Sequence, residues 1–109
     1  MSDYTTSAYD STAYEASAVV KAASGVLYGF SGYNARTSAQ FIQFHNSATV
    51  PSDTTAPLVI MTVPASSNFS LDFGKYGKAF GTGISWSNST TGATKTIGSA
   101  DVWMNALYR

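Results

Sequence analysis

The residues that could perform chemistry are few: one histidine, His45, six acids and no cysteine. Nucleophilic catalysis would need His45 beside a serine such as Ser47, with an acid such as Asp53 orienting the ring. A chain this rich in serine supplies such neighbours by chance, and no nucleophile-elbow pattern accompanies them. We therefore interpret His45 as a surface residue at the end of a strand and predict no catalytic residue.

The acidic residues are isolated, at positions 3, 10, 15, 53, 72 and 101. A glycosidase pair could still meet in space, but Asp72 alternates outward from a predicted strand and Asp53 lies in a turn-like Pro-Ser-Asp. A histidine metal site would need carboxylates for every other ligand, because there is no second histidine and no thiolate. The sequence predicts no metal site and no cofactor, and we expect the protein not to be an enzyme.

Glycines at positions 74, 77, 81 and 83 punctuate a stretch that also holds Lys75 and Lys78. Asp72 occupies the place of the first glycine of a phosphate-binding P-loop, so that motif is absent. Gly81-Thr-Gly83 lacks the third glycine of a dinucleotide fingerprint. This stretch therefore predicts turns and a bulge between strands.

Charge is scarce throughout the chain. The net charge is zero and charged residues make up 11% of the 109 positions, against about 25% in a typical protein. Nucleic-acid binding needs clustered Lys and Arg, which are scattered here, so we expect no nucleic-acid partner. The start of the chain is polar and the longest apolar run covers residues 58–61, which predicts neither a secretion signal nor a membrane span. A surface with so little charge tolerates close packing against other copies or another protein.

Short strands separated by turn residues account for most of the chain. We predict strands at residues 17–22, 26–33, 38–45, 58–63, 68–73, 79–88 and 101–108. The apolar run of residues 58–63 favours a central strand buried on both faces. This spacing predicts an all-β fold, a single antiparallel β-sandwich of jelly-roll-like type spanning residues 17–109.

Alternation assigns the side chains of several strands to the core. Val26, Tyr28 and Phe30 are expected on one face. The other side chains predicted to point inward are Ile42, Phe44, Phe69, Leu71, Phe73, Ile84, Trp86, Val102, Met104, Ala106 and Tyr108.

The first sixteen residues differ from the rest, and we interpret residues 1–16 as an extended N-terminal arm outside the core. Tyr4, Tyr9 and Tyr14 are spaced five apart, which matches neither helix nor strand periodicity, and each offers a large apolar ring with a polar tip. The three tyrosines are the predicted partner-binding residues. An arm folded back on its own domain is the alternative. Thr12-Ala-Tyr-Glu15 also fits a capping box, so a short helix at about residues 12–23 competes with a strand.

The stretch Val-Leu-Tyr-Gly-Phe-Ser-Gly-Tyr-Asn at residues 26–34 carries a family resemblance, together with residues 39–44, 65–70 and 81–84. It resembles small virion proteins of tailed bacteriophages: capsid cement (decoration) proteins and related head-fibre or tail-tip domains, including those of cyanophages. The resemblance implies a jelly-roll-like sandwich, often a homotrimer, on the outer surface of the phage head. Its implied partner is the major capsid protein, which extended terminal arms would clasp.

Two functions follow as hypotheses. The first is a decoration protein, made in the host cytoplasm, that stabilises the assembled head through multivalent contacts of its arms. The alternative is a receptor-binding or fibre-tip domain that recognises host-surface glycans. Trp86, Tyr76 and Tyr33 would then offer stacking surfaces, and the loops at residues 46–57 and 89–99 would line the site.

Overall fold

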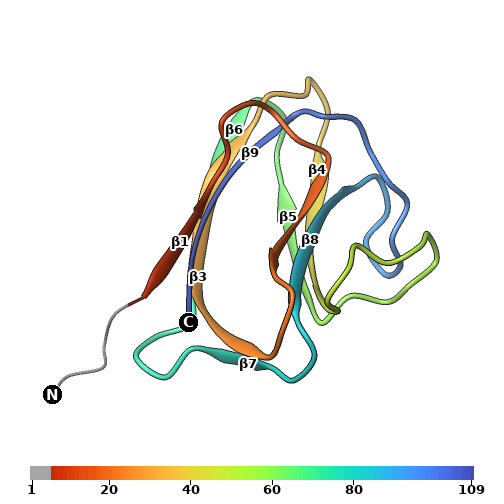
Figure 1. Cartoon of the computed structure of the whole chain (residues 1–109). Helices are drawn as coiled ribbons and strands as arrows, with labels where there is room; N and C mark the ends of the chain where they lie inside the picture. Colours follow the sequence, from red (N-terminus) through yellow and green to blue (C-terminus); the bar gives the residue numbers. More distant parts are fainter. Residues whose placement is uncertain (1–5) are drawn as a thin grey trace, which may run out of the picture.

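The strands form two antiparallel sheets that pack face to face in a computed structural model describing residues 6–109. Figure 1 shows β1, β3 and β9 in one layer and β4, β5 and β8 in the other. No helix occurs within these residues, so the prediction of an all-β antiparallel sandwich is confirmed. The strands are β1 (Ser7–Asp10), β2 (Ser17–Lys21), β3 (Gly25–Asn34), β4 (Gln40–Asn46), β5 (Val59–Val63), β6 (Ser67–Asp72), β7 (Lys78–Phe80), β8 (Ile84–Ser89) and β9 (Val102–Tyr108).

Sheet A has the strand order β1-β9-β3-β6, and the short β7 pairs with the start of β3. Sheet B has the order β2-β8-β4-β5. The register of sheet A places Tyr33 of β3 opposite both Trp103 of β9 and Asn68 of β6. Residues far apart in sequence therefore lie side by side across three strands.

The core lies between the two sheets. The rings of Phe30 from sheet A and Phe44 from sheet B pack with centroids 4.6 Å apart. Alternation predicted the core side chains of the last two strands correctly, since Ile84, Trp86 and Met104 are fully buried. Burying each large apolar side chain contributes about 1.5–3 kcal/mol, so this interface is the main source of stability.

The prediction of a central strand at residues 58–63 is wrong. β5 is an edge strand of sheet B, and its side chains alternate between core and solvent. Val63 is fully buried, whereas Ile60 is 46% exposed and Leu58 nearly as much. A continuous apolar run lacks the alternation of apolar and polar residues, so the sequence cannot distinguish a strand that is buried on both faces from one that exposes one face.

In the first half of β3, the prediction of which side chains point into the core is also wrong. The register against β9 shifts between Leu27 and Gly29, as in a β-bulge. Leu27 and Phe30 therefore enter the core together, rather than Val26, Tyr28 and Phe30. A bulge adds one residue to the strand and moves every side chain before it to the other face.

The single strand expected at residues 79–88 is two strands. β7 belongs to sheet A and β8 to sheet B, so the chain crosses between the layers at residues 81–83. At this crossing a Cβ on Gly83 would lie 2.6 Å from Ala48 Cα, which only a glycine permits.

The described part of the predicted arm packs on the sandwich, which corrects the expectation that it lies outside the core. β1 pairs with β9, so that Asp10 stands opposite Asn105, and Ser11 is buried. Glu15 then bridges to Val102 before β2 begins. Pairing with sheet A therefore already includes Ser7–Asp10, and Tyr4 lies outside the described residues.

The helix that competed for residues 12–23 does not form. Instead of capping a helix, the Glu15 carboxylate accepts hydrogen bonds from the Tyr9 hydroxyl at 2.6 Å and the Ser11 hydroxyl at 2.7 Å. The partly buried Tyr9 has a raised pKa, because of burial and because of this carboxylate. Within residues 6–109 there is no helix that could span a membrane.

Candidate binding face of sheet A

Over β4 and β8, the outer face of sheet B is covered by the chain's own loops. Ile42 and Trp86 point into the core, so their neighbours Gln43 and Ser87 point to the opposite side, yet both are fully buried. The Gln43 amide nitrogen donates to the carbonyl oxygens of Thr91, Gly92 and Thr94, which fixes the second loop over the sheet. In Figure 1 the loops of residues 46–57 and 89–99 lie on this outer side.

An ion pair ties these two loops together. The Lys95 ammonium lies 2.7 Å from Asp53 Oδ1, although Lys95 is only 4% exposed. Main-chain bonds join the same segments, from Thr54 N–H to the Lys95 carbonyl and from Lys95 N–H to the Thr55 carbonyl. The hydrogen bond from Lys95, supported by one from the Ile97 N–H, holds the pKa of Asp53 below its usual value. The two loops thus hold each other in place over sheet B, and the first of them lines a hollow of about 380 Å³ that contains no tyrosine or tryptophan for stacking on a sugar.

His45 is buried, which corrects its interpretation as a surface residue. It is 2% exposed, and its Nε2 lies 2.8 Å from Ser87 Oγ. Burial, together with the charge of Lys95, lowers the pKa of His45 to about 4. Its Nδ1 has no hydrogen-bond partner among residues 6–109, and Asp53 is engaged by Lys95. The arrangement is a buried polar pair without the acid and the solvent access that nucleophilic catalysis requires.

The outer face of sheet A, by contrast, is open to solvent. Phe30, Phe69 and Met104 point into the core, so the residues that alternate with them point outward. These outward residues are Ser31, Tyr33, Asn68, Ser70, Trp103 and Asn105. They come from three adjacent strands and carry aromatic rings, amides and hydroxyls.

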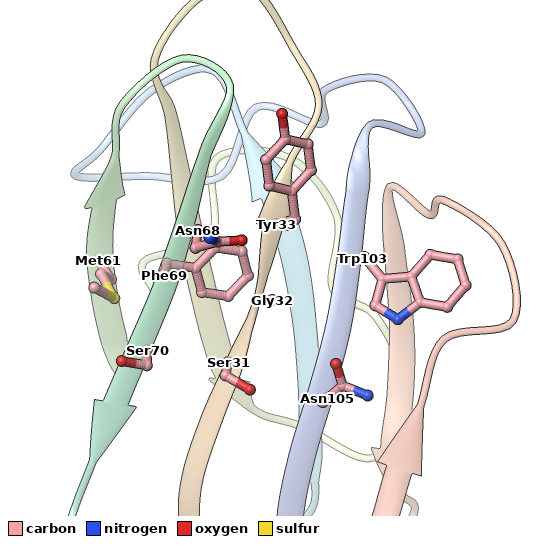
Figure 2. Close-up of a pocket in the computed structure, with 9 residues that line it drawn as sticks. All are labelled: Ser31, Gly32, Tyr33, Met61, Asn68, Phe69, Ser70, Trp103 and Asn105. Atoms are coloured by element: carbon pink, nitrogen blue, oxygen red, sulfur yellow. The ribbon is translucent and has the colours of Figure 1, made fainter.

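A first hollow of about 590 Å³ lies over this face and is lined by Tyr33, Trp103 and polar side chains of the three strands. Figure 2 shows Tyr33, Ser31, Ser70 and Asn105 projecting from β3, β6 and β9. Tyr14 packs edge-on against Trp103, with ring centroids 5.8 Å apart and planes at 83°. This contact holds the indole from the side of the N-terminal segment.

A second hollow of about 490 Å³ continues from the first along β3, and the two share Ser31, Ser70 and Asn105. Gly29 leaves its centre without a side chain, and Leu107, 51% exposed, lines it from β9. Two carboxylates from opposite edges of the sheet also line it, and both are exposed: Asp10 of β1 and Asp72 of β6. We call the two hollows together the sheet A groove.

The predicted aromatic residues are distributed over different parts of the structure. Tyr33 lies in the groove, but Trp86 is in the core and cannot stack on a ligand. Tyr76 is 83% exposed, with Lys75 Nζ 5.6 Å from its ring centre. Among the predicted arm anchors, Tyr9 packs against the core and Tyr14 against Trp103.

Sequence reasoning missed the other groove residues, above all Trp103, Asn68 and Asn105. A signal for them existed, because each alternates with a correctly predicted core residue of its strand. Within residues 6–109 no three His, Asp or Glu side chains gather where a metal ion could bind. Comparison with models of known families, with curated proteins and with solved structures finds no match.

Proposed function

We propose that the chain is a non-enzymatic binding protein of a bacteriophage virion surface and that the sheet A groove binds carbohydrate. One observation carries this proposal: an open groove in which Trp103 and Tyr33 stand beside amide and hydroxyl side chains. The virion setting rests on the resemblance of residues 26–34 and the accompanying segments to phage virion proteins.

The chemistry of the groove suits a sugar ring. A sugar presents a C–H face that packs on an aromatic ring, and a rim of hydroxyls that both donate and accept hydrogen bonds. Trp103 and Tyr33 offer rings for the first contact. Asn68 offers an acceptor and two donors. Asn105, whose amide nitrogen donates one hydrogen bond to Asp10, offers an acceptor and one donor, and Ser31 offers a hydroxyl. All of these lie on strands, which hold a binding site more rigidly than loops do.

Tryptophan fluorescence tests the proposal directly, because Trp103 is in the groove and Trp86 is buried. The ligands are neutral oligosaccharides built from glucose, galactose or N-acetylhexosamine units. As they are titrated in, the fluorescence of Trp103 should change and then reach a plateau. Trp103→Ala should abolish binding measured by calorimetry, and Tyr76→Ala, an exposed aromatic outside the groove, should leave it unchanged. Recovered ligand should be intact. Binding that survives Trp103→Ala would refute the groove, and shortened products would refute the non-enzymatic role.

A second candidate function, capsid decoration, is favoured by edge strand β5. Among residues 6–109, one edge of β5 has no neighbouring strand to pair with its backbone N–H and C=O groups. The strand contains no charged residue or proline, and Ile60, like Leu58 just before the strand, is exposed. Natural edge strands are usually protected by charge, proline or a covering segment, so an unprotected apolar edge suits pairing with another chain. We propose a second copy as its occupant. If β5 of each copy contacts a different edge of the next copy around a threefold axis, this contact gives the homotrimer expected of a decoration protein bound to the major capsid protein. Ile60 points to the side of β5 opposite Met61, the residue of this strand that lines the groove.

Sedimentation with assembled phage heads tests this function. The protein should be a trimer in solution and should sediment with heads, whereas Ile60→Lys should be monomeric and bind heads far more weakly. Ala93→Lys, an exposed position outside β5, makes the same change of net charge and should leave the trimer and head binding unchanged. Deletion of residues 2–5, which leaves β1 intact, tests the arm anchor Tyr4 and should reduce head binding. A stable wild-type monomer that ignores heads would overturn the decoration function.

A further inference from the structure

We infer that the sheet A groove selects uncharged oligosaccharides and rejects anionic ones, because the carboxylates of Asp10 and Asp72 flank its second hollow. This inference rests on the carbohydrate binding proposed above. It adds the class of ligand, its placement along β3 and the residues that decide between ligands.

The ligand is longer than one sugar. The two hollows follow β3 from Tyr33 to Gly29, a span of four residues or about 13 Å. Their volumes, about 590 and 490 Å³, each fall in the range of small-molecule sites. One unit therefore packs on Trp103 and Tyr33, and the chain of sugars continues over Ser31 and Ser70 into the second hollow.

The second hollow differs from the first in its charge. Asp10 enters from β1, where its Oδ1 accepts a hydrogen bond from the Asn105 amide at 2.8 Å. Asp72 enters from β6, where its Oδ1 accepts the Gly74 N–H at 2.7 Å. Each carboxylate keeps a second oxygen that can accept a hydrogen bond from a sugar hydroxyl. Between them lie Gly29 and the exposed side chain of Leu107, which suit the apolar face of a ring.

No cation offsets these two carboxylates among the residues that line the groove. Neither Asp10 nor Asp72 belongs to an ion pair of the described residues. Lys75, the basic residue closest in sequence to Asp72, lies over the Tyr76 ring. Beyond the Trp103 end, Asp101 and Arg36 pair at 3.3 Å and so contribute little net charge. A uronic acid, sialic acid or sugar phosphate in the second hollow would meet repulsion without a compensating contact.

Two charges about 6 Å from an anionic group in water disfavour it by roughly tenfold together, and salt reduces the effect. The experiment therefore compares matched ligands: a neutral tetrasaccharide and the same tetrasaccharide oxidised to a uronic acid at its terminal unit. Wild-type protein should bind the neutral form roughly tenfold more tightly at low salt. The preference should shrink at high ionic strength, and a monosaccharide should bind more weakly than either.

Variants identify the carboxylates as the cause. Asp10→Asn and Asp72→Asn should each reduce the ratio of the affinity for the neutral ligand to that for the anionic ligand, and the double variant should bring this ratio close to one. Ala93→Lys makes the matched change of net charge on the loop over sheet B and should leave the preference unchanged. Two outcomes would overturn this inference and leave the proposed function standing. One is Trp103-dependent binding with equal affinity for the neutral and anionic ligands; the other is a preference for the neutral ligand that the double variant retains. An absence of any Trp103-dependent carbohydrate binding would overturn the proposed function and this inference with it.

Discussion

His45 Nε2 lies 2.8 Å from Ser87 Oγ, within the polar layer between sheet B and the loops that cover it. The two residues come from neighbouring strands β4 and β8, and both are shielded from solvent. The burial of His45 makes the stability of the protein depend on pH, and its pairing with Ser87 makes it depend on one hydroxyl.

The pH dependence follows from the pKa of His45, which burial lowers from an ordinary 6.5 to about 4. The unfolded chain takes up a proton as the pH falls through 6.5, whereas the folded chain does so only near pH 4. Stability is therefore full above pH 6.5 and is lost as the pH falls from 6.5 to 4, by about 3 kcal/mol in total. Urea unfolding at pH 7.5 and pH 4.5 measures the loss. His45→Gln should reduce this dependence, and an equal slope in both proteins would contradict the assignment.

Removing the partner hydroxyl should destabilise the protein. Ser87→Ala leaves His45 Nε2 buried without a hydrogen bond, which costs about 1–3 kcal/mol in the free energy of unfolding. Ser70→Ala removes a hydroxyl from the exposed face of β6 and should change stability by no more than about 0.5 kcal/mol. Chemical denaturation of both variants gives the comparison.

The loops over sheet B should loosen when their ion pair is broken. Asp53→Ala leaves the buried Lys95 ammonium without its counter-charge, so the segment of residues 46–57 should be cleaved faster in limited proteolysis. Asp101→Ala breaks the partly exposed pair with Arg36 and should have little effect. Because the pKa of folded Asp53 is depressed, its contribution is present above the ordinary value of 3.8 and is lost as the pH falls through the folded value. Equal cleavage of both variants would show that the pair does not hold the loops.

Gly32 should not tolerate a side chain. A Cβ there would lie 1.8 Å from the Trp103 carbonyl oxygen and 2.6 Å from Phe69 Cζ, so β3 and β9 would have to separate. Gly32→Ala should cost about 1–3 kcal/mol or more, as overpacking does. At Gly81 a Cβ meets nothing within 4 Å, and Gly81→Ala should be close to neutral. Thermal unfolding of the two variants decides the matter, and equal melting temperatures would contradict the close approach.

The two tryptophans should respond differently to a water-soluble quencher. Trp86 is fully buried and Trp103 is partly exposed on sheet A. Acrylamide should quench wild-type emission in two components, and Trp103→Phe should retain only the protected one. A readily quenched Trp103→Phe would place Trp86 at the surface and contradict the packing of β8 in the core.

The fold class and much of the core could be predicted from the sequence, because alternation along one strand depends only on local geometry. Val102, Met104 and Ala106 alternate with polar or large residues in β9, and that pattern places them inward whichever strands lie beside them. The same reasoning from alternation failed at two places: at the bulge before Phe30 and at β5, whose outer side is open. Neither leaves a local signature, since one extra residue or one missing neighbour does not alter the residue types.

The candidate site depended on tertiary structure. Tyr33, Asn68 and Trp103 meet only because β3 lies between β6 and β9, and strand order is a property of pairing over long sequence separations. The same holds for His45, whose burial results from loops that return over sheet B. The sequence alone determined that the chain is neutral and all-β, and for several strands it determined which side chains lie on the same face. Only the packing of the whole chain decided that loops cover the outer side of β4 and β8 and leave that of sheet A open, because covering a face requires contacts that no single strand contains.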